Sequence, residues 1–340
     1  MKIAINGFGR IGRLFLRQAF GTKNIDIVAI NDLGDVDNLA YLLTHDTVYG
    51  KWDHIVKADN IKKTITIDGA VIQFVQEREI SKLPWGALGV DVVVESTGLF
   101  ESFEKSRPHL SAGAKRVVIT APAKDDDSTD AKTVLCGINE SDLKSIVISS
   151  NGSCTTNSVS PVMAILSENP GIEHAILSTV HAYTATQHLV DGPDGKDWRR
   201  GRAAAQNIVP STTGAGIAVT RVVPSLKGKF DGISLRVPVS AGSISDITFV
   251  TKRSVTADEI NDILRKASAE PRWEGILKVS DDELVSSDII GEPYGAIIDA
   301  KFTRVVDGKL VKVLSWYDNE YGYARTLLLH VQRAGESLSQ

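Results

Sequence analysis

Cys154 is the residue best suited to covalent chemistry, because it lies among small polar residues where a predicted strand gives way to a helix. The strand ends in a glycine-containing turn at residues 149–153, and the helix begins at the cysteine. Unpaired amide groups and the positive end of the helix dipole would lower the pKa of a thiol placed there. We therefore expect a thiolate nucleophile at Cys154. The alternative for an isolated cysteine, a small buried apolar side chain, fits Cys136, whose neighbours are apolar.

His181 is the histidine best placed to act as the base for such a nucleophile. It ends the strand-like run 175–180 and is followed by the polar segment 182–187, whereas the remaining histidines lack comparable polar neighbours. An imidazole near Cys154 could hold the thiolate and then accept a proton from an oxyanion. The alternative, a capping or surface histidine, stays open when His181 is considered by itself.

Anion-binding side chains come from three separate segments, namely residues 198–202, 211–214 and 235–238, which contain several Arg and Thr. Arg236 lies inside an apolar β-type run, where a guanidinium is costly to bury unless it meets an anion. Phosphate is the natural partner for forked guanidinium and hydroxyl donors, although an internal carboxylate is the alternative for any one arginine. The acidic run 125–127 is better explained as a solvated loop than as a metal site, because its spacing is not that of a calcium loop.

The first strand runs directly into Gly7, Gly9 and Gly12, which have the G-x-G-x-x-G spacing of a dinucleotide site. This chemistry needs a sharp turn, a close approach of backbone to pyrophosphate, and tight packing of helix on strand. Asp32 follows Gly12 by twenty residues, at the end of a second strand, where a carboxylate would bind the adenine ribose. A carboxylate there repels a 2′-phosphate, so the sequence favours NAD over NADP.

The elements that must position these residues alternate between apolar runs and helix-period segments over the first 150 residues. This alternation predicts a doubly wound parallel sheet. An antiparallel hairpin with a turn at residues 68–69 is expected to interrupt it at residues 64–75. The strands are expected at residues 3–5, 25–30, 90–95, 116–120 and 146–149.

From about residue 150 the pattern changes to longer β-type stretches, which predict a second, α+β domain with a mixed or antiparallel sheet. Helices are expected near residues 155–168, 256–269 and 319–334, the second of them capped by Thr256. The polar loop 191–202 is long enough to indicate a functional role. Strands are expected at residues 175–180, 232–239, 245–252 and 311–317.

The composition excludes several classes of protein. With 38 Lys+Arg against 42 Asp+Glu and a net charge of -4, the chain shows no footprint for nucleic acid or an anionic membrane. Two cysteines in 340 residues cannot form a disulfide framework, which favours a reducing cytoplasm. The sequence has no long apolar stretch and no secretory signal pattern, so we expect no membrane association.

In its motifs and their order, nearly the whole chain, about residues 1–333, resembles the phosphorylating glyceraldehyde-3-phosphate dehydrogenases. The motifs are NGFGRIGR (6–13), ND (31–32), ESTG (95–98), APAK (121–124), SCTTN (153–157), HAYTATQ (181–187), VDGP (190–193), AAQNIVP (204–210), TTGA (212–215), RVP (236–238) and WYDNEYGY (316–323).

The resemblance implies oxidation of glyceraldehyde 3-phosphate with NAD and inorganic phosphate, with Cys154 as nucleophile and His181 as general base. It implies a Rossmann-type NAD-binding domain at residues 1–152, completed by a C-terminal helix at 319–335, and a catalytic domain at 153–318. The 191–202 loop resembles a segment at subunit interfaces, which implies a homotetramer. The NAD contacts implied by the resemblance are Asn6, Arg10, Ile11, Asp32, Arg78, Thr120 and Asn319, and the glycine motif adds Gly7, Gly9 and Gly12. The implied contacts to substrate phosphate or inorganic phosphate are Thr184, Thr186, Arg200, Arg236, Ser153, Thr155, Thr213 and Gly214.

Two departures and two alternatives accompany the resemblance. Ser158 stands where most relatives have a second cysteine, and residues 239–243 differ from the usual Thr-x-Asn-Val-Ser, which puts the local β geometry in question. Erythrose-4-phosphate dehydrogenases are an alternative, but they usually differ from the TATQ and TTGA motifs found here. A non-catalytic NAD- or RNA-binding scaffold is the other alternative, against which the Cys154 and His181 pair and the net charge of -4 argue.

Overall fold

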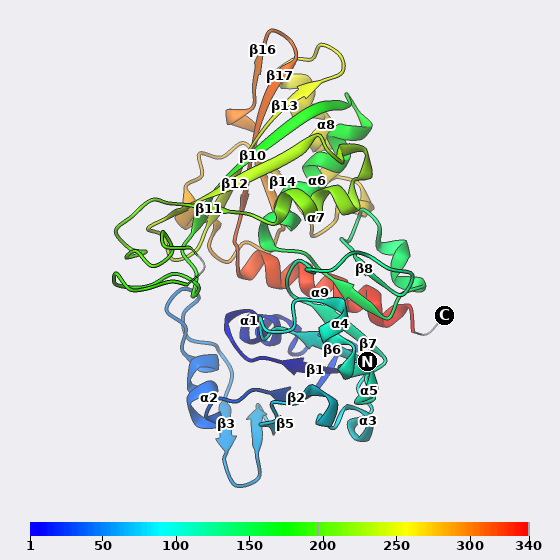
Figure 1. The fold of residues 1–340 in the computed structure, drawn as a ribbon, viewed down its shortest axis with the longest axis vertical. Helices are drawn as coiled ribbons and strands as arrows, with labels where there is room; N and C mark the ends of the chain where they lie inside the picture. Colours follow the sequence, from blue (N-terminus) through cyan, green and yellow to red (C-terminus); the bar gives the residue numbers. More distant parts are fainter. Residues whose placement is uncertain (196, 339–340) are drawn as a thin grey trace. The chain divides into compact units, whose positions relative to one another are not determined.

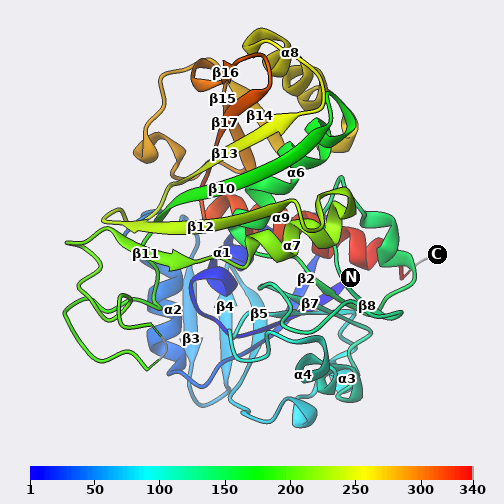
Figure 2. The same cartoon turned by 45° about the horizontal axis from the view of Figure 1, so that its top comes forward.

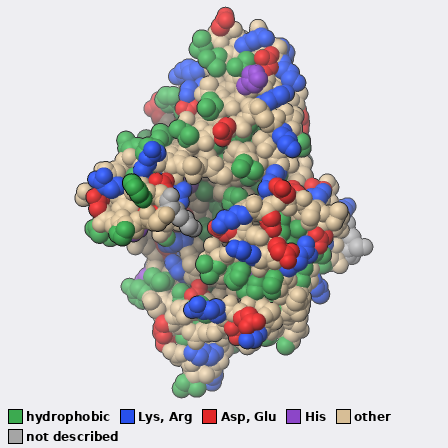
Figure 3. Space-filling model, viewed as in Figure 1, with side chains coloured by type: hydrophobic (Ala, Val, Ile, Leu, Met, Phe, Trp, Pro, Cys, Tyr) green, Lys and Arg blue, Asp and Glu red, His purple; other side chains and the backbone are tan. Residues whose placement is uncertain are grey.

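A computed structural model describes residues 1–195 and 197–338, and confirms the predicted α/β fold (Figure 1). The chain forms two compact units: unit 1 comprises Met1–Gly152 with the end of the chain from Leu327, and unit 2 comprises Ser153–Thr326. Within the described residues no helix is long and apolar enough to cross a membrane. On the face shown in Figure 3, basic and acidic side chains are interspersed rather than gathered into one field.

Unit 1 contains a sheet with the strand order β3-β4-β5-β2-β1-β6-β7-β9-β8, in which β5 through β8 pair in parallel. The predicted hairpin is present, with Asp68 and Gly69 at positive φ, and a strand that was not predicted, β3, extends it. The strands are β1 Lys2–Asn6, β2 Asp26–Asn31, β3 Val56–Asp59, β4 Thr64–Ile67, β5 Ala70–Val75, β6 Val92–Glu95, β7 Arg116–Ile119, β8 Ala131–Thr133 and β9 Ile148–Ser150.

The strand order of unit 1 reverses at β1, which lies between β2 and β6. Asn6, the last residue of β1, is in register with Asn31 on one side and Glu95 on the other. In open α/β sheets, ligands bind outside the carboxyl ends of the strands at such a switch point. The three polar residues therefore lie where a ligand site is expected.

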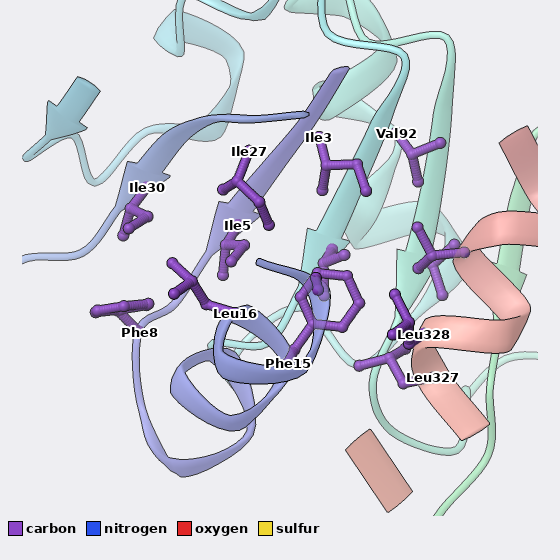
Figure 4. Packing of buried hydrophobic residues seen from close by; sticks show 14 of the residues in the cluster. Ile3, Ile5, Phe8, Phe15, Leu16, Ile27, Ile30, Val92, Leu327 and Leu328 are labelled. Carbon is purple, nitrogen blue, oxygen red and sulfur yellow. The ribbon is translucent and has the colours of Figure 1, made fainter. Parts of the chain in front are cut away.

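The core of unit 1 joins β1, the helix after it and the last helix of the chain (Figure 4). Ile3 and Ile5 of β1 pack with Phe15 of α1 and with Leu327 and Leu328 of α9, all of them buried. Burying a side chain of this kind contributes roughly 1.5–3 kcal/mol. The packing fixes the direction in which the helix leaves the glycine-rich turn.

Unit 2 contains a mixed sheet, as predicted, with the order β11-β12-β10-β13-β17-β15-β14 and β16 paired to β17. Figures 1 and 2 show β11, β12, β10 and β13 side by side. Strands β10 and β12 pair in parallel, whereas β13 and β17 run antiparallel to their neighbours. The strands are β10 Ile172–Ala182, β11 Val209–Thr212, β12 Phe230–Val237, β13 Ser243–Thr251, β14 Leu277–Ser280, β15 Ala296–Asp299, β16 Arg304–Val306 and β17 Leu310–Tyr317.

The helix ends follow local hydrogen bonding. Thr256 caps α8 by accepting from the Glu259 amide, as predicted. The expected last helix begins two residues later than predicted, because the Asp318 carboxylate accepts from the amides of Glu320 and Tyr321 and leaves Asn319 outside the helix. The helices are α1 Arg10–Ala19, α2 Val36–Thr44, α3 Trp85–Leu88, α4 Phe103–Ser106, α5 Pro108–Ser111, α6 Cys154–Glu168, α7 Ala215–Val222, α8 Ala257–Ser268 and α9 Tyr321–Glu336.

Two loops were singled out by the sequence, namely the acidic run 125–127 and the polar loop 191–202. The acidic run is not merely solvated, because Asp125 accepts hydrogen bonds from the Phe103 and Glu104 amides and so holds the start of α4. The loop at 191–202 has no regular strand or helix among its described residues, and Lys196 lies outside them.

Candidate active site

Cys154 occupies the first position of α6, as the sequence predicted. The preceding residue, Ser153, caps the helix: its hydroxyl accepts from the Thr156 amide at 3.0 Å, and Thr156 Oγ1 accepts from the Ser153 amide at 3.1 Å. This reciprocal capping box satisfies two amides that would otherwise lack partners. It therefore holds the start of the helix, and with it the sulfur atom, in one orientation.

His181 lies against the cysteine, with its Nε2 atom 3.3 Å from Cys154 Sγ. It is the next-to-last residue of β10 and pairs in register with Arg236 of the parallel strand β12. The other ring nitrogen, Nδ1, lies 2.7 Å from the Ala182 carbonyl and 2.9 Å from Arg236 Nη1. The structure thus brings together the predicted nucleophile, base and arginine within unit 2.

These contacts allow His181 to hydrogen-bond to Cys154 both as a thiol and as a thiolate. With a proton on Nδ1, His181 donates to the Ala182 carbonyl and leaves Nε2 free to accept the thiol proton. With Nδ1 accepting from Arg236, Nε2 carries the proton and donates to a thiolate. The Ala182 carbonyl keeps a donor in both cases, because Arg236 Nη1 lies 3.2 Å from it.

Burial opposes the ionisation of both members of this pair, in the direction opposite to the lowered thiol pKa expected from the helix N-terminus. Burial raises the pKa of the Cys154 thiol, although Arg236 and the hydrogen bonds of Thr155 oppose the shift. Burial, and then the charge of Arg236, lowers the pKa of His181 to about 3. Both shifts disfavour the charged forms, namely the Cys154 thiolate and the His181 imidazolium. Burial also raises the pKa of Cys136 to about 12, which agrees with its predicted role as a buried thiol.

Tyr317 is a site residue that the motif analysis did not single out. Its hydroxyl lies 2.9 Å from Thr155 Oγ1 in α6 and 2.7 Å from Thr179 Oγ1 in β10. Its ring meets the His181 ring edge to face, with centroids 5.9 Å apart. Tyr317 therefore ties the helix that carries the cysteine to the strand that carries the histidine. Its position in the WYDNEYGY motif was the only signal in the sequence.

Arg236 keeps an uncompensated positive charge near the sulfur. Among the described residues no carboxylate forms an ion pair with it, which argues against the internal-pair alternative. Burial lowers its pKa, Cys154 and Tyr317 oppose this shift, and the charge of Arg200 adds a smaller lowering. Arg200 lies 3.7 Å from the Asp197 carboxylate, so the internal-pair alternative holds in part for Arg200, and an anion would mainly offset the charge of Arg236.

The remaining predicted phosphate ligands lie on loops and helix ends of unit 2. Arg200 donates to Ser211 Oγ in β11 at 2.8 Å. Thr184 and Thr186 face each other, with their hydroxyl oxygens 3.0 Å apart. Thr213 Oγ1 accepts from the Ala215 amide, and Gly214 is the N-cap of α7, so both lie where a helix begins.

Ser243 joins the histidine strand to Asn319. Its hydroxyl accepts from the Ala182 amide at 3.1 Å and donates to Asn319 Oδ1 at 3.0 Å. This orients the Asn319 amide, because the bond assigns its oxygen. The divergent segment 239–243 ends at Ser243 and needs a glycine at position 242. Gly242 has φ +85°, and a Cβ there would lie 2.3 Å from the Ser286 carbonyl oxygen. The segment 239–243 is thus an ordered connection into β13, built around a glycine.

In unit 1, a cavity of about 300 Å³ lies at the switch point of the sheet. Predicted cofactor contacts line it, together with residues at or just after the ends of β2, β5 and β6 that sequence reasoning missed. The lining residues include the predicted Asn6, Gly7, Gly9, Asp32 and Arg78, and the missed Asn31, Glu77, Ser96 and Thr97. A dinucleotide fits this lining, because α1 begins at Arg10 with no side-chain cap and a Cβ on Gly9 would meet no atom within 4 Å.

The other predicted cofactor contacts do not line the cavity. Arg10 is engaged by the Asp46 carboxylate and lies over the Tyr49 ring. Gly12 serves packing, since a Cβ there would lie 2.3 Å from the Gly7 carbonyl. Ile11 is half-buried in α1, and the Thr120 amide donates to the Glu95 carbonyl at the end of β7.

Comparisons with known proteins point to one family for both units. A profile described as "Glyceraldehyde 3-phosphate dehydrogenase, NAD binding domain" matches residues 1–103, and one described as "Glyceraldehyde 3-phosphate dehydrogenase, C-terminal domain" matches residues 153–319. Glyceraldehyde-3-phosphate dehydrogenase of Streptomyces coelicolor is 46% identical over 331 residues, covering 96% of each chain. Relatives of the same name from Trichormus variabilis and Mycobacterium avium are 48% and 47% identical, over at least 95% of each chain. The chain therefore belongs to the glyceraldehyde-3-phosphate dehydrogenase family.

Proposed function

We propose that the protein oxidises glyceraldehyde 3-phosphate with NAD and inorganic phosphate to 1,3-bisphosphoglycerate. The observation that carries this proposal is the Cys154–His181 pair at 3.3 Å, beside Arg236, whose guanidinium forms no ion pair with any described carboxylate. A sulfur nucleophile, a base and an anion site in contact are the parts that phosphate-dependent aldehyde oxidation requires.

The chemistry of the chain's own residues follows from this geometry. Cys154 sulfur adds to the aldehyde carbon as its proton passes to His181 Nε2, and His181 then gives that proton to the carbonyl oxygen, which forms the thiohemiacetal hydroxyl. NAD, when bound, supplies the hydride acceptor. The proton leaves the resulting thiohemiacetal hydroxyl for His181 as hydride departs, which yields a thioester on Cys154. Phosphate oxygen then attacks the thioester carbon, and the thiolate departs as the acyl phosphate forms.

The anion ligands divide between two phosphates. We assign Thr184, Thr186 and Arg236 to the phosphate of the substrate, with Arg200 near both groups. Backbone and hydroxyl donors at the starts of α6 and α7 would take inorganic phosphate, because helix N-termini favour anions. These latter donors belong to Ser153, Thr155, Thr213 and Gly214.

The cofactor site belongs to unit 1 in this proposal, and the catalytic residues to unit 2. Asn6, the three motif glycines, Asp32 and Arg78 would contact NAD through the switch-point cavity, and Asn319 would orient the nicotinamide amide. Arg10, Ile11 and Thr120 remain proposed contacts from the family resemblance. We also propose a cytoplasmic homotetramer, on the basis of the 191–202 loop and the cysteine content.

A spectrophotometric assay of NADH formation tests the proposal. We expect steady turnover with glyceraldehyde 3-phosphate, NAD and inorganic phosphate, and at most one turnover's worth of NADH without phosphate or arsenate. Erythrose 4-phosphate in the same assay tests the alternative substrate. Faster oxidation of erythrose 4-phosphate, or turnover that ignores phosphate, would contradict the proposal.

Asp32→Ala is expected to shift cofactor preference toward NADP. The carboxylate lies in the cavity and accepts from the Phe8 amide at 2.7 Å and the Gly34 amide at 2.8 Å. Its loss removes the charge that repels a 2′-phosphate and an acceptor for a ribose hydroxyl, so we expect NAD kcat/KM to fall about tenfold while that for NADP rises. Asp35→Ala is the matched control, because Asp35 caps α2 outside the cavity. An unchanged NAD/NADP ratio in Asp32→Ala would contradict the assignment.

A further inference from the structure

A buried polar network lies directly beneath the switch-point cavity of unit 1, and the reaction sequence above does not use it. Trp85, Glu95 and His109 form its centre, and their exposed fractions are 0%, 2% and 0%. None of the three lines the cavity. Burying a carboxylate destabilises the folded protein unless hydrogen bonds satisfy its oxygens. Proteins in which a buried ionic group is replaced by well-packed apolar side chains are often equally stable. Such a group calls for an explanation beyond stability.

The direction of each hydrogen bond in the network is determined by groups that can only donate or only accept. The Trp85 indole N–H can only donate, and it lies 2.9 Å from His109 Nδ1. His109 Nδ1 must therefore accept, so the ring proton resides on Nε2. That nitrogen lies 2.9 Å from Glu95 Oε2 and donates to it.

Glu95 accepts four hydrogen bonds, two on each carboxyl oxygen. Its Oε2 accepts from His109 and from Asn6 Nδ2 at 2.5 Å. Its Oε1 accepts from the Thr97 amide at 2.9 Å and from the Thr97 hydroxyl at 2.5 Å. Each oxygen therefore faces two donors and no acceptor, so a proton on this carboxyl would have no hydrogen-bond partner.

From Glu95 the network reaches the residues that line the cavity. Because Asn6 Nδ2 donates to Glu95, its Oδ1 points to Asn31 Nδ2, at 2.7 Å. Asn31 in turn exchanges hydrogen bonds with the Glu77 backbone, donating to the carbonyl and accepting from the amide, each at 2.9 Å. Both amide orientations, and the end of β5, thus depend on the carboxylate.

On the other side, Glu95 shapes the turn that supports the glycine-rich loop. The Thr97 bonds fold the chain back immediately after β6, and a Cβ on Gly7 would lie 2.5 Å from the Thr97 amide nitrogen. The neighbouring Ser96 hydroxyl donates to the Gly7 carbonyl at 2.6 Å. The first glycine of the motif therefore rests on a turn whose conformation Glu95 maintains.

We infer that Glu95 and His109, oriented by Trp85, are positioning residues of the cofactor site, which hold the Asn6 amide and the Thr97 turn in the geometry that binds a dinucleotide. This inference rests on the proposed function, since it takes the switch-point cavity as the NAD site. Neither residue touches the cavity, so each acts through Asn6 and Thr97.

Substitutions of similar size test whether hydrogen bonding by these residues, rather than the space they fill, supports NAD binding. Glu95→Gln keeps the shape but turns an NH₂ group toward donors, and His109→Leu removes the donor to Glu95. We expect each to weaken NAD binding at least about tenfold, measured by isothermal titration calorimetry. Apparent KM for NAD should rise in parallel, with kcat at saturating NAD changed less than about threefold. His109→Gln can donate to Glu95 and accept from Trp85, so it should bind NAD within about threefold of the wild type.

His330→Leu is the matched control for loss of a buried histidine in the same unit. His330 is fully buried, contacts Ser149 Oγ at 2.7 Å and lies outside the cavity lining. We expect it to lower the melting temperature as His109→Leu does, without changing the NAD dissociation constant. In isothermal titration calorimetry only the folded molecules bind NAD, so a dissociation constant can still be measured for a destabilised variant at a temperature where it is folded.

The outcomes distinguish the two proposals. A wild-type protein that does not bind NAD would contradict the proposed function itself. A wild-type protein that binds NAD, with Glu95→Gln and His109→Leu binding equally well, would overturn the inference alone. Equal loss of affinity in His330→Leu would also overturn it, because the effect would then belong to stability. Failure of His109→Gln to restore affinity would show that the donor and acceptor pattern is not what matters.

Discussion

Cys154→Ser is expected to lower phosphate-dependent NADH formation on the order of 10⁴-fold or more. A serine hydroxyl is a far weaker acid than a thiol, and burial already raises the pKa of the group at this position. The thioester that phosphate attacks would also be replaced by a less reactive ester.

Initial rates at saturating substrate, with calorimetric NAD binding as a second measurement, check this expectation. NAD affinity should stay near that of the wild type, because the cavity lining of unit 1 does not include Cys154. Cys136→Ala is the control: that thiol is buried, with its pKa raised to about 12, and should not react. Activity retained by Cys154→Ser, or lost in Cys136→Ala, would show that the wrong cysteine carries the chemistry.

His181→Gln is expected to reduce kcat between about 10²- and 10⁴-fold, the usual contribution of a general base. Glutamine can donate to the sulfur but cannot accept its proton. His174→Gln provides a control on the same strand, because His174 lies in β10 with an exposed side chain. We expect that control to keep full activity. A decrease of less than about tenfold in His181→Gln would exclude proton transfer to His181 as an important step.

The pH profile gives an independent readout of this pair. Since the pKa of Cys154 is raised, the thiolate fraction grows as the pH increases, and the rate of Cys154 alkylation by iodoacetamide should increase from neutral into alkaline solution. His181, with a pKa of about 3, stays neutral across this range and should add no inflection near pH 6–7. A plateau of alkylation starting near pH 6, lost in His181→Gln, would instead indicate a resting thiolate–imidazolium pair.

Local features of this protein could be predicted from the sequence because they depend on neighbours along the chain. The Asp68-Gly69 turn, the Thr256 cap and the start of α6 at Cys154 each follow from residues within four positions. The alternation of apolar runs was enough to predict the parallel sheet of unit 1. The cofactor loop was recognisable for the same reason, since its glycines and Asp32 are spaced by one β-α-β unit.

Features that depend on pairing between distant segments could not be predicted in this way. His181 and Arg236 meet because two parallel strands align them across 55 residues, and Glu95 meets Asn6 and His109 through sheet register and packing. The predicted start of the last helix was wrong for a local reason instead: the Asp318 carboxylate accepts from the Glu320 and Tyr321 amides, so the helix begins two residues later.

The direction of the Cys154 pKa shift shows the same limit most clearly. The sequence by itself determined that a thiol stands at a helix N-terminus, next to candidate base and anion-binding residues. Only the tertiary structure decided how far that thiol and His181 are removed from water. Desolvation is the sum of everything packed around a group, so it cannot be read from adjacent residues.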